Sequence, residues 1–339
     1  MNSKQNIGLL RRQFFGTTTW GKRVTVFACV FIGMILGAGW TYERIGERTD
    51  ALAYPPTGVM IAVDHHRLHL HCIGPIGVGP TIVLENGLGG WSQTWGNIQT
   101  ELAKKARTCA YDRAGYGWSE LGDLSHDAIS TADQLHSLLH RSAEAAPYLL
   151  VGASIGGLYV RMYAYQYPKD IAGLAFLDPS TEDQLTALPQ EEYAKDRDKP
   201  NRWKEWAARF GYLRLKFWFG GSPPDKETGA IQAHLSAPFY YIGRRRDIDD
   251  WGKTDSEVRA TGSLGSVPLI VVSAGSGQSP AFIAARHRLH ARIAHLSTAG
   301  SQQIVPEAAH ASLLFNPDHS KYSIAAILNV WEAAKAGTP

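Results

Sequence analysis

Short apolar runs alternate with amphipathic segments along most of this chain. Each run has the length of a strand and is bounded by turn residues. These runs predict strands at residues 59–63, 68–73, 80–84, 108–111, 148–151, 171–177, 267–273 and 303–305. Between them, apolar residues recur at helical spacing, which predicts helices over residues 93–106, 126–143, 156–167, 281–296 and 322–336. Strands that alternate with helices build a mostly parallel sheet with helices on both faces, so we expect an α/β fold.

The run that begins at Tyr148 leads directly into Gly152-Ala-Ser-Ile-Gly156. A serine between two glycines, with a strand before it and a helix after it, has the form of a nucleophile elbow. At so sharp a turn, a side chain at position 152 or 156 would collide with neighbouring backbone, and glycine avoids the collision. The pentapeptide alone can arise by chance in a glycine-rich chain, and its position between strand and helix gives it weight. We expect Ser154 to project from the sheet with its hydroxyl accessible.

Residues 181–262 interrupt the alternation. They are rich in charge and in tryptophan, and they contain no run typical of a parallel strand. A connection this long carries helices of its own, so we expect a helical cap over a core formed by residues 58–180 and 263–339. Within the cap, the run of arginines at 244–246 is expected to form a solvated face, and attraction of an acidic substrate or of lipid headgroups is the alternative.

The N-terminal segment combines basic and apolar residues. The uncharged run Val24 to Trp40 is at the short end of the length that spans a bilayer. Residues 1–23 carry only positive charges, at Lys4, Arg11, Arg12, Lys22 and Arg23. This pattern predicts a transmembrane anchor over 24–40, a cytoplasmic N-terminus, a linker over 41–57 and a core on the extracytoplasmic side of the inner or plasma membrane. The alternatives are a signal peptide cleaved near residues 37–39, which would release a secreted protein, a twin-arginine address, and a buried core helix.

Charge and cysteine content exclude some classes. A formal net charge of +3 argues against a dedicated nucleic-acid surface. Three cysteines are too few for a domain built on disulfides. Cys29 lies in the apolar N-terminal run, and we expect Cys72 and Cys109 to be buried free thiols, with pairing in an oxidising compartment as the alternative. His69 and His71 lie on one face of a strand, but no third ligand is evident, which favours a polar strand face over a metal site.

Four motifs in this order resemble the α/β-hydrolase fold family over residues 58–338. They are Asn86-Gly-Leu-Gly89, Asp112-Arg-Ala-Gly-Tyr-Gly-Trp-Ser119, the elbow pentapeptide, and His310 after the last strand. The resemblance implies a triad in the order Ser, acid, His, with Ser154 as nucleophile and His310 as base. It also implies that the segment 112–119 is a structural turn beside the site rather than part of the chemistry.

The chain departs from the family pattern in two places. The oxyanion loop opens with Asn86-Gly87 instead of His-Gly, and Ala274 to Ser279, after the strand near 267–273, contains no acid. An acid must orient the imidazole, and Asp178 ends the strand that follows the elbow helix. Members resembling haloalkane dehalogenases place their acid there. A simple Asp-Pro turn is the alternative role for Asp178. The acidic residues Glu307 and Asp318 lie near His310 in sequence, at positions that the family does not use.

These residues together predict a serine hydrolase. Ser154 would attack an acyl carbonyl while His310, held by Asp178, takes its proton. The backbone N–H groups of Leu88 and Ile155 would bind the oxyanion, and the reaction requires no cofactor and no metal. The aromatic cap favours a small apolar or aromatic ester as substrate. Serine at the elbow disfavours dehalogenase and epoxide hydrolase chemistry, for which similar proteins use aspartate. Hydrolysis of a C–C or amide bond, perhydrolysis and a catalytically silent binding protein remain open, as does the oligomeric state.

Overall fold

A single sheet forms the centre of the molecule. The computed structural model describes residues 19–196, 199–200, 202–221, 223 and 225–337. The sheet has 8 strands in the order β1-β2-β4-β3-β5-β6-β7-β8. Their bounds are β1 Val59–Val63, β2 His66–Ile73, β3 Thr81–Glu85, β4 Thr108–Tyr111, β5 Tyr148–Ala153, β6 Ile171–Leu177, β7 Leu269–Ala274 and β8 Gly300–Val305. β1 and β2 form an antiparallel hairpin, β2 is antiparallel to β4, and all pairs from β4 to β8 are parallel, which confirms the predicted sheet.

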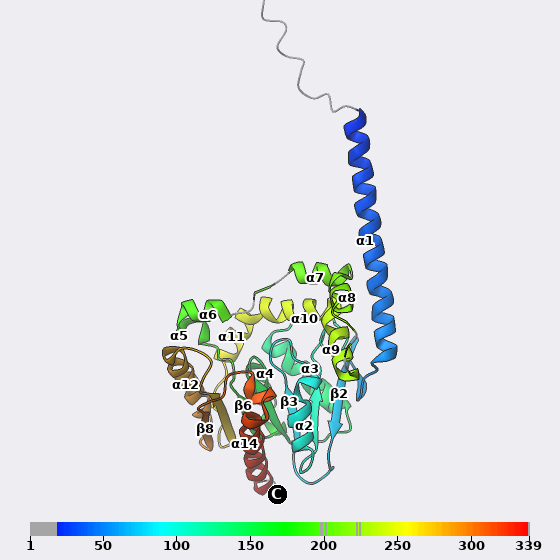
Figure 1. The fold of residues 1–339 in the computed structure, drawn as a ribbon. Coiled ribbons are helices and arrows are strands. Elements are labelled where there is room, and N and C mark those ends of the chain that lie inside the picture. The colour runs from blue at the N-terminus through cyan, green and yellow to red at the C-terminus, as the bar shows by residue number, and fades with distance from the viewer. Residues whose placement is uncertain (1–18, 197–198, 201, 222, 224, 338–339) are drawn as a thin grey trace, which may run out of the picture.

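Helices cover both faces of this sheet (Figure 1). They are η1 Ser92–Trp95, α2 Gly96–Leu102, α3 Ala128–Arg141, α4 Gly156–Gln166, η2 Pro168–Asp170, α12 Pro280–Ala294, α13 Ser312–Phe315 and α14 Pro317–Ala336. Alternate residues of a strand point to opposite faces, so β5 contributes to two cores. Leu150 packs in a core with α3 and α4, whereas Leu149 and Val151 pack in the opposite core with α2 and α14. The strand is therefore apolar at every position because both of its faces are buried.

The C-terminal helix α14 begins earlier than the expected start at residue 322. Asn316 precedes the helix and its side chain accepts a hydrogen bond from the backbone N–H of Asp318. Pro317 occupies the first turn, where its missing N–H costs nothing and its fixed φ suits a helix. The polar first turn carries no apolar spacing, so the capping residues rather than the periodicity set this boundary.

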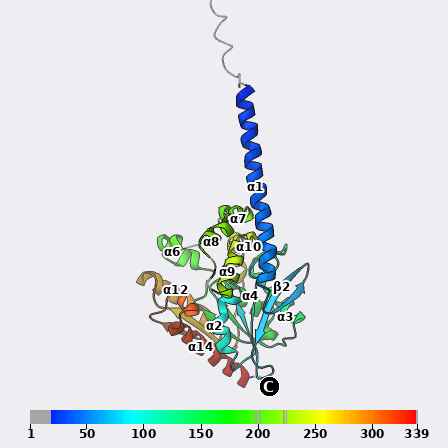
Figure 2. The same ribbon diagram turned by 45° about the vertical axis from the view of Figure 1, so that its right-hand side comes forward.

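The segment between β6 and β7 is helical and lies above the C-terminal edge of the strands (Figures 1 and 2). Its helices are α5 Gln184–Ala187, α6 Gln190–Asp196, α7 Arg202–Arg209, α8 Tyr212–Phe219, α9 Lys226–Ser236, α10 Pro238–Asp249 and α11 Trp251–Arg259. The solvated arginine face expected at 244–246 is not what forms. Arg245 is half-buried and bonds Glu205 and Asp249, and Arg246 donates to the carbonyls of Leu121 and Gly122.

The N-terminal helix α1, Thr19–Ala53, extends well beyond the expected end of the apolar run at Trp40. Its N-terminal half projects from the body, and its C-terminal half lies beside the cap (Figures 1 and 2). The stretch Trp20–Ala53 is long and apolar enough to cross a membrane, with a mean hydropathy of 2.0 in its most apolar window. The polar residues after Trp40 continue the helix because one side of it packs on the cap. The basic positions Lys4, Arg11 and Arg12 lie outside the described residues.

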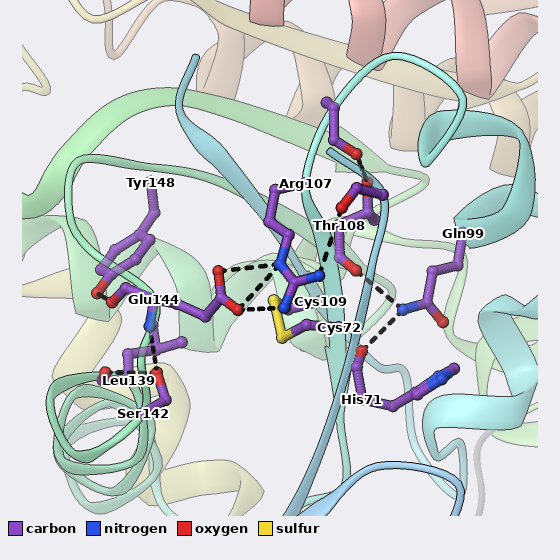
Figure 3. The surroundings of a disulfide bond; sticks show 12 residues. His71, Cys72, Gln99, Arg107, Thr108, Cys109, Leu139, Ser142, Glu144 and Tyr148 are labelled. Carbon is purple, nitrogen blue, oxygen red and sulfur yellow. Dashed lines mark hydrogen bonds and ion pairs between the residues drawn. A yellow bond between two sulfur atoms is a disulfide. The ribbon is translucent and has the colours of Figure 1, made fainter. Parts of the chain in front are cut away.

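Cys72 and Cys109 form a disulfide, so the expectation of free thiols is wrong (Figure 3). The antiparallel pairing of β2 with β4 sets the two residues directly opposite each other, with their Cα atoms 4.0 Å apart. This register depends on which strands become neighbours, and local sequence patterns do not reveal it. Arg107 and Glu144 form an ion pair of 2.6 Å beside the bridge (Figure 3).

The disulfide predicts a defined thiol count and a defined loss of stability. Thiol titration of the denatured chain should find one reactive thiol, Cys29, before reduction and three after it. Replacing both bridge residues, Cys72→Ala with Cys109→Ala, should lower the free energy of unfolding by about 3–4 kcal/mol, the range for a loop of this length. Urea unfolding in detergent measures the loss. Cys29→Ala should leave the stability unchanged, and three reactive thiols before reduction would contradict the bridge.

Candidate active site

Ser154 lies at a strained turn between β5 and α4. Its φ of 54° is in the left-handed region, which residues with a side chain seldom occupy. The flanking glycines make this turn possible. A Cβ on Gly152 would lie 2.7 Å from the carbonyl oxygen of Gly156, and one on Gly156 would lie 2.6 Å from that of Asn86. The collisions expected from the pentapeptide are therefore real, and the turn has the geometry of a nucleophile elbow.

Asp178 and His310 meet at the C-terminal edge of the sheet. Asp178 follows β6 with a φ of 44°, and His310 follows β8. The Nδ1 atom of His310 donates to Oδ2 of Asp178 over 2.7 Å. The other carboxylate oxygen accepts from the backbone N–H of Ala274 over 2.8 Å, at the end of β7. The Asp178 carboxylate therefore lies next to the loop that follows β7, and this loop has no acidic residue of its own.

The two other acids near His310 do not reach its ring. The side chain of Asp318 is 87% exposed at the start of α14, where it lies 3.9 Å from Lys321. Glu307 uses its backbone carbonyl to accept from the hydroxyl of Ser276. Of the acids considered from the sequence, Asp178 is the one that holds the imidazole, and its hydrogen bond fixes the tautomer with Nδ1 protonated and Nε2 free to accept.

The Asp178 carboxylate is buried, and it is surrounded by basic groups from α12. Burial acts to raise its pKa, but the hydrogen bond from His310 and the basic groups around the carboxylate, with Arg286 contributing least among them, outweigh burial and hold the pKa below its ordinary value. Arg286 lies 3.3 Å from Oδ2 and also donates to the carbonyl of Ala274. The carboxylate is therefore ionised at neutral pH, as a group that stabilises an imidazolium must be.

His290 lies beneath the same carboxylate as a neutral ring. Its Nδ1 is 2.8 Å from the Ser273 hydroxyl and its Nε2 is 2.9 Å from the carbonyl of Pro179. Burial lowers the pKa of His290 to about 4, against the opposing charge of Asp178. No local pattern in the sequence predicts Arg286 or His290 here, because both come from a helix that follows β7, about a hundred residues after the acid.

A buried arginine supports the loop after β3. Arg113 donates to the carboxylate of Glu85 over 2.6 Å and to the backbone carbonyls of Asn86 and Gly87 over 2.7 and 2.9 Å. It also bonds Asp247 of α10 over 3.0 Å. The segment 112–119 therefore has a positioning role: it orients the loop that leads to Leu88.

The rest of that segment forms the expected structural turn. The Asp112 carboxylate accepts from the backbone N–H groups of Ser92 and Trp118 and from Nδ1 of His69. His69 is thus held within a buried hydrogen-bond network.

Among the described residues, the one group of side chains with metal-ligand spacing is Cys72, Cys109 and Glu144. Both sulfur atoms of this group are bonded to each other in the disulfide.

Two backbone amides at or near the elbow make no hydrogen bond that the described residues account for. Within the described part of the chain, the N–H groups of Leu88 and Ile155 donate to no protein acceptor. The loop packs closely on the serine, since a Cβ on Gly87 would lie 3.2 Å from the Ser154 Cβ. No hydrogen bond joins Ser154 to His310 among the described residues, although both line one pocket. Such bonds commonly tighten only when substrate is present.

The pocket has a volume of about 1150 Å³ and reaches from the elbow into the cap. Core residues Ser154, Asp178 and His310 lie at its base. Apolar side chains of the cap and of α12 and α13 form much of its wall, namely Leu188, Ile231, Trp251, Phe282, Leu289, Leu313 and Phe315. This cavity is large enough for a substrate with a sizeable apolar portion.

Comparison with known proteins agrees with this architecture. Residues 80–236 match the family model described as alpha/beta hydrolase fold. The uncharacterized protein YqjL of Bacillus subtilis (strain 168) is 34% identical over 115 residues, which are 33% of this chain and 46% of that protein. The chain spans about half or less of the length of the curated relatives it matches.

Solved structures show the same fold. A putative lipase from Acinetobacter baumannii AYE superposes with a TM-score of 0.62 at 15% identity, over 87% of this chain and 97% of that one. A putative epoxide hydrolase from Pseudomonas aeruginosa superposes with a TM-score of 0.64 at 15% identity, over 81% and 97% of the two chains. Identities this low show a shared fold and leave the chemistry to the residues of the site.

The buried His290 predicts an acid-sensitive stability. An unfolded imidazole binds a proton near pH 6.5, whereas the folded pKa is about 4. Between these two pH values the folded chain binds fewer protons than the unfolded chain. The free energy of unfolding therefore has its full value above pH 6.5 and decreases as the pH falls through this window. This one group accounts for a loss of about 3 kcal/mol in the free energy of unfolding, at about 1.4 kcal/mol per pKa unit. In His290→Gln, urea unfolding at pH 7 and about pH 4.5 should show a smaller difference than in the wild type.

The exposed residue His295, at the end of the same helix, provides the matched control. His295→Gln should keep the wild-type difference between the two pH values. An unchanged difference in His290→Gln would contradict a neutral buried ring.

Proposed function

We propose that this chain, which belongs to the α/β-hydrolase fold family, is a membrane-anchored serine hydrolase that cleaves a carboxylic ester through an acyl-enzyme. The observation that carries the proposal is the 2.7 Å hydrogen bond from His310 to the buried Asp178, at the base of a pocket that Ser154 also lines. This is the acid–base half of a triad, with the serine at a strained elbow within the same cavity.

In the proposed reaction, the Ser154 hydroxyl attacks the ester carbonyl and His310 Nε2 takes its proton. The imidazolium that forms is stabilised by the ionised Asp178, which stays a carboxylate throughout. The N–H groups of Leu88 and Ile155 donate to the oxyanion of the tetrahedral intermediate, which is worth about 3–4 kcal/mol for each donor. His310 then returns the proton to the alcohol leaving group, and a water molecule, activated by the same ring, hydrolyses the acyl-enzyme.

An apolar or aromatic ester suits the pocket better than a charged one. Its wall is formed largely by aliphatic and aromatic side chains of the cap and of α12 and α13. Desolvating an ionised substrate against such a wall costs several kcal/mol unless a partner charge is present.

The anchor is proposed from α1 and from the disulfide together. The uncharged run Val24 to Trp40 follows Lys22 and Arg23, and cations collect on the cytoplasmic side of a membrane span. The body then lies on the extracytoplasmic side. The disulfide between Cys72 and Cys109 supports this orientation, because such bonds persist in oxidising compartments and are rare in the cytosol.

The triad assignment predicts how three substitutions behave. Ser154→Ala should abolish labelling by a fluorophosphonate probe and turnover of p-nitrophenyl esters, while the folded state is kept. His310→Ala should also abolish turnover. Asp178→Asn should lower kcat by about 10³–10⁴-fold, because the amide no longer favours the Nδ1-protonated tautomer. Gel fluorescence and initial rates measure these effects.

Matched variants make this test specific. Ser256→Ala and Asp318→Asn change an exposed serine in the cap and an exposed acid near His310, and both should retain labelling and turnover. If Ser154→Ala stays active, the mechanism is wrong. If Asp318→Asn rather than Asp178→Asn loses activity, only the acid is wrongly assigned.

The anchor predicts the location of the C-terminus. Alkaline phosphatase, which folds only in an oxidising compartment, should be active when fused after Pro339, and a cytoplasmic reporter such as β-galactosidase should be inactive at the same site. Membrane fractionation should recover the fusion with the membrane after a high-salt wash. The opposite reporter pattern would overturn the orientation, and recovery in the soluble fraction would overturn the anchor.

A further inference from the structure

Two short cap helices expose an unusual amount of aromatic surface. On α7 and α8, Trp203, Trp218 and Phe219 have 67%, 68% and 74% of their surface exposed. We define the cap-tip surface as six exposed side chains of these helices: Trp203, Trp206, Tyr212, Leu215, Trp218 and Phe219. Single exposed apolar residues are common, but a cluster of large ones marks a surface that meets another apolar phase.

The cap-tip surface lies beside the end of the apolar run of α1. α1 contacts α7, α8 and α9, and both ribbon views show α7 at the end of the body from which the N-terminal half of α1 projects (Figures 1 and 2). A Cβ on Gly39 would lie 2.5 Å from the carbonyl oxygen of Phe210, in the turn between α7 and α8. Because the apolar run ends at Trp40 and the first charged residue after it is Glu43, this contact is level with the point where α1 would leave the hydrocarbon.

Ion pairs fix the position of the cap helix α8 along α1. Arg214 of α8 bonds Glu43 over 2.9 Å and also bonds Asp50, and the Glu43 side chain is buried. A Cβ on Gly46 would collide with the Arg214 side chain, so glycine is what allows this close approach. The contacts run from position 39 to position 50, which is about 16 Å at 1.5 Å per residue. α8 can neither slide along α1 nor turn away from it without breaking these ion pairs.

The chemistry of α7 and α8 is that of an interfacial helix pair. Tryptophan and tyrosine concentrate at the headgroup level of a bilayer, where an apolar ring and a polar edge are both accommodated. Exposed Arg202, Lys204 and Lys216 accompany the aromatic residues on the same two helices. Basic residues beside apolar ones favour contact with anionic headgroups, and such helices lie with their apolar side about 5–10 Å into the interface.

We propose that the cap-tip surface binds the extracytoplasmic interface of the same bilayer that α1 spans. The proposal rests on the anchor described under the proposed function and does not depend on the serine chemistry. The cap-tip surface adjoins the end of the membrane-spanning part of α1. The bilayer that surrounds this span therefore reaches the cap-tip surface as well, which is why we choose the bilayer as its binding partner. α9 follows α8 and lines the pocket with Glu227 and Ile231, so the lipid-facing helices adjoin a wall of the active site.

Site-directed spin labelling of the full chain in vesicles with anionic lipid tests the proposal. In a Cys29→Ser background, in which the disulfide leaves no other free thiol, single variants Trp218→Cys and Phe219→Cys carry the label. Ile304→Cys, on a strand edge with 47% exposure, is the aqueous control, and the native Cys29 is the reference within the span. Collision rates with oxygen and with a water-soluble nickel complex report the depth of each label.

The ratio of the collision rate with oxygen to that with the nickel complex should be about tenfold higher for labels at 218 and 219 than for the label at 304. It should be lower at 218 and 219 than at Cys29. The same ratio at 218, 219 and 304 would overturn the proposal. Dipolar broadening at 218 with exclusion of both reagents would also overturn it, by showing contact with a second copy. If Cys29 itself gives an aqueous ratio, the anchor fails, and fluorophosphonate labelling of Ser154 then reports the hydrolase proposal independently.

A second measurement leaves the cysteines unchanged. Replacing Trp203, Trp206 and Trp218 together by serine should lower the fraction of tryptophan fluorescence that brominated lipids quench, while Trp20 and Trp40 of α1 remain as an internal reference. Fluorophosphonate labelling of the variant should equal that of the wild type, since these residues lie outside the pocket lining. An unchanged quenched fraction in a variant that labels normally would overturn the proposal.

Discussion

The Asp178 carboxylate connects three strand ends of the sheet. It follows β6, accepts the backbone N–H of Ala274 at the end of β7, and holds the ring of His310 beyond β8. A buried carboxylate is costly unless hydrogen bonds and charges compensate it, and here Arg286 and His310 do so. The order β6-β7-β8 in the sheet is therefore a condition for the site, because it brings these groups within reach of one oxygen pair.

The backbone is strained at two of the strand ends that form the site, after β5 and after β6. Ser154 and Asp178 both have positive φ, and each follows a strand whose neighbours on both sides are parallel and buried. Such backbone conformations cost about 1–3 kcal/mol each and persist only where the surroundings fix them. Hydrogen bonds do this here: the Ser154 N–H donates to the carbonyl of Leu177, and the Ser180 N–H donates to that of Ser154, so the two strained turns brace each other.

The sheet and the elbow turn could be predicted from local sequence because each depends on a few adjacent residues, whereas the choice of Asp178 as the acid needed the family resemblance and the lack of an acid directly after residue 273. An apolar run with both faces buried is visible in one segment, and so is a serine between two glycines. Contacts between distant segments are not visible in this way. Neither the pairing of Cys72 with Cys109 nor the position of Arg286 beside Asp178 follows from any window of the chain, since both depend on strand order and helix placement. The continuation of α1 past Trp40 likewise depends on packing against Arg214, 171 residues from its partner Glu43.

The cap combines parts that are fixed to the core with parts that are not. Asp247 of α10 is fully buried, and it accepts from Arg113, Tyr116 and His126 of the core. Removing α10 from the core would leave buried charges unpaired, at a cost of about 3–5 kcal/mol for each broken pair. Because Arg113 also holds the carbonyls of Asn86 and Gly87, the same movement would release the loop that carries Leu88. Lifting the whole cap would therefore disrupt both the buried ion pairs of Asp247 and the loop after β3. The cap helices α6 and α9 line the pocket and make no such buried ion pairs with the core within the described part of the chain, so they can move without that cost.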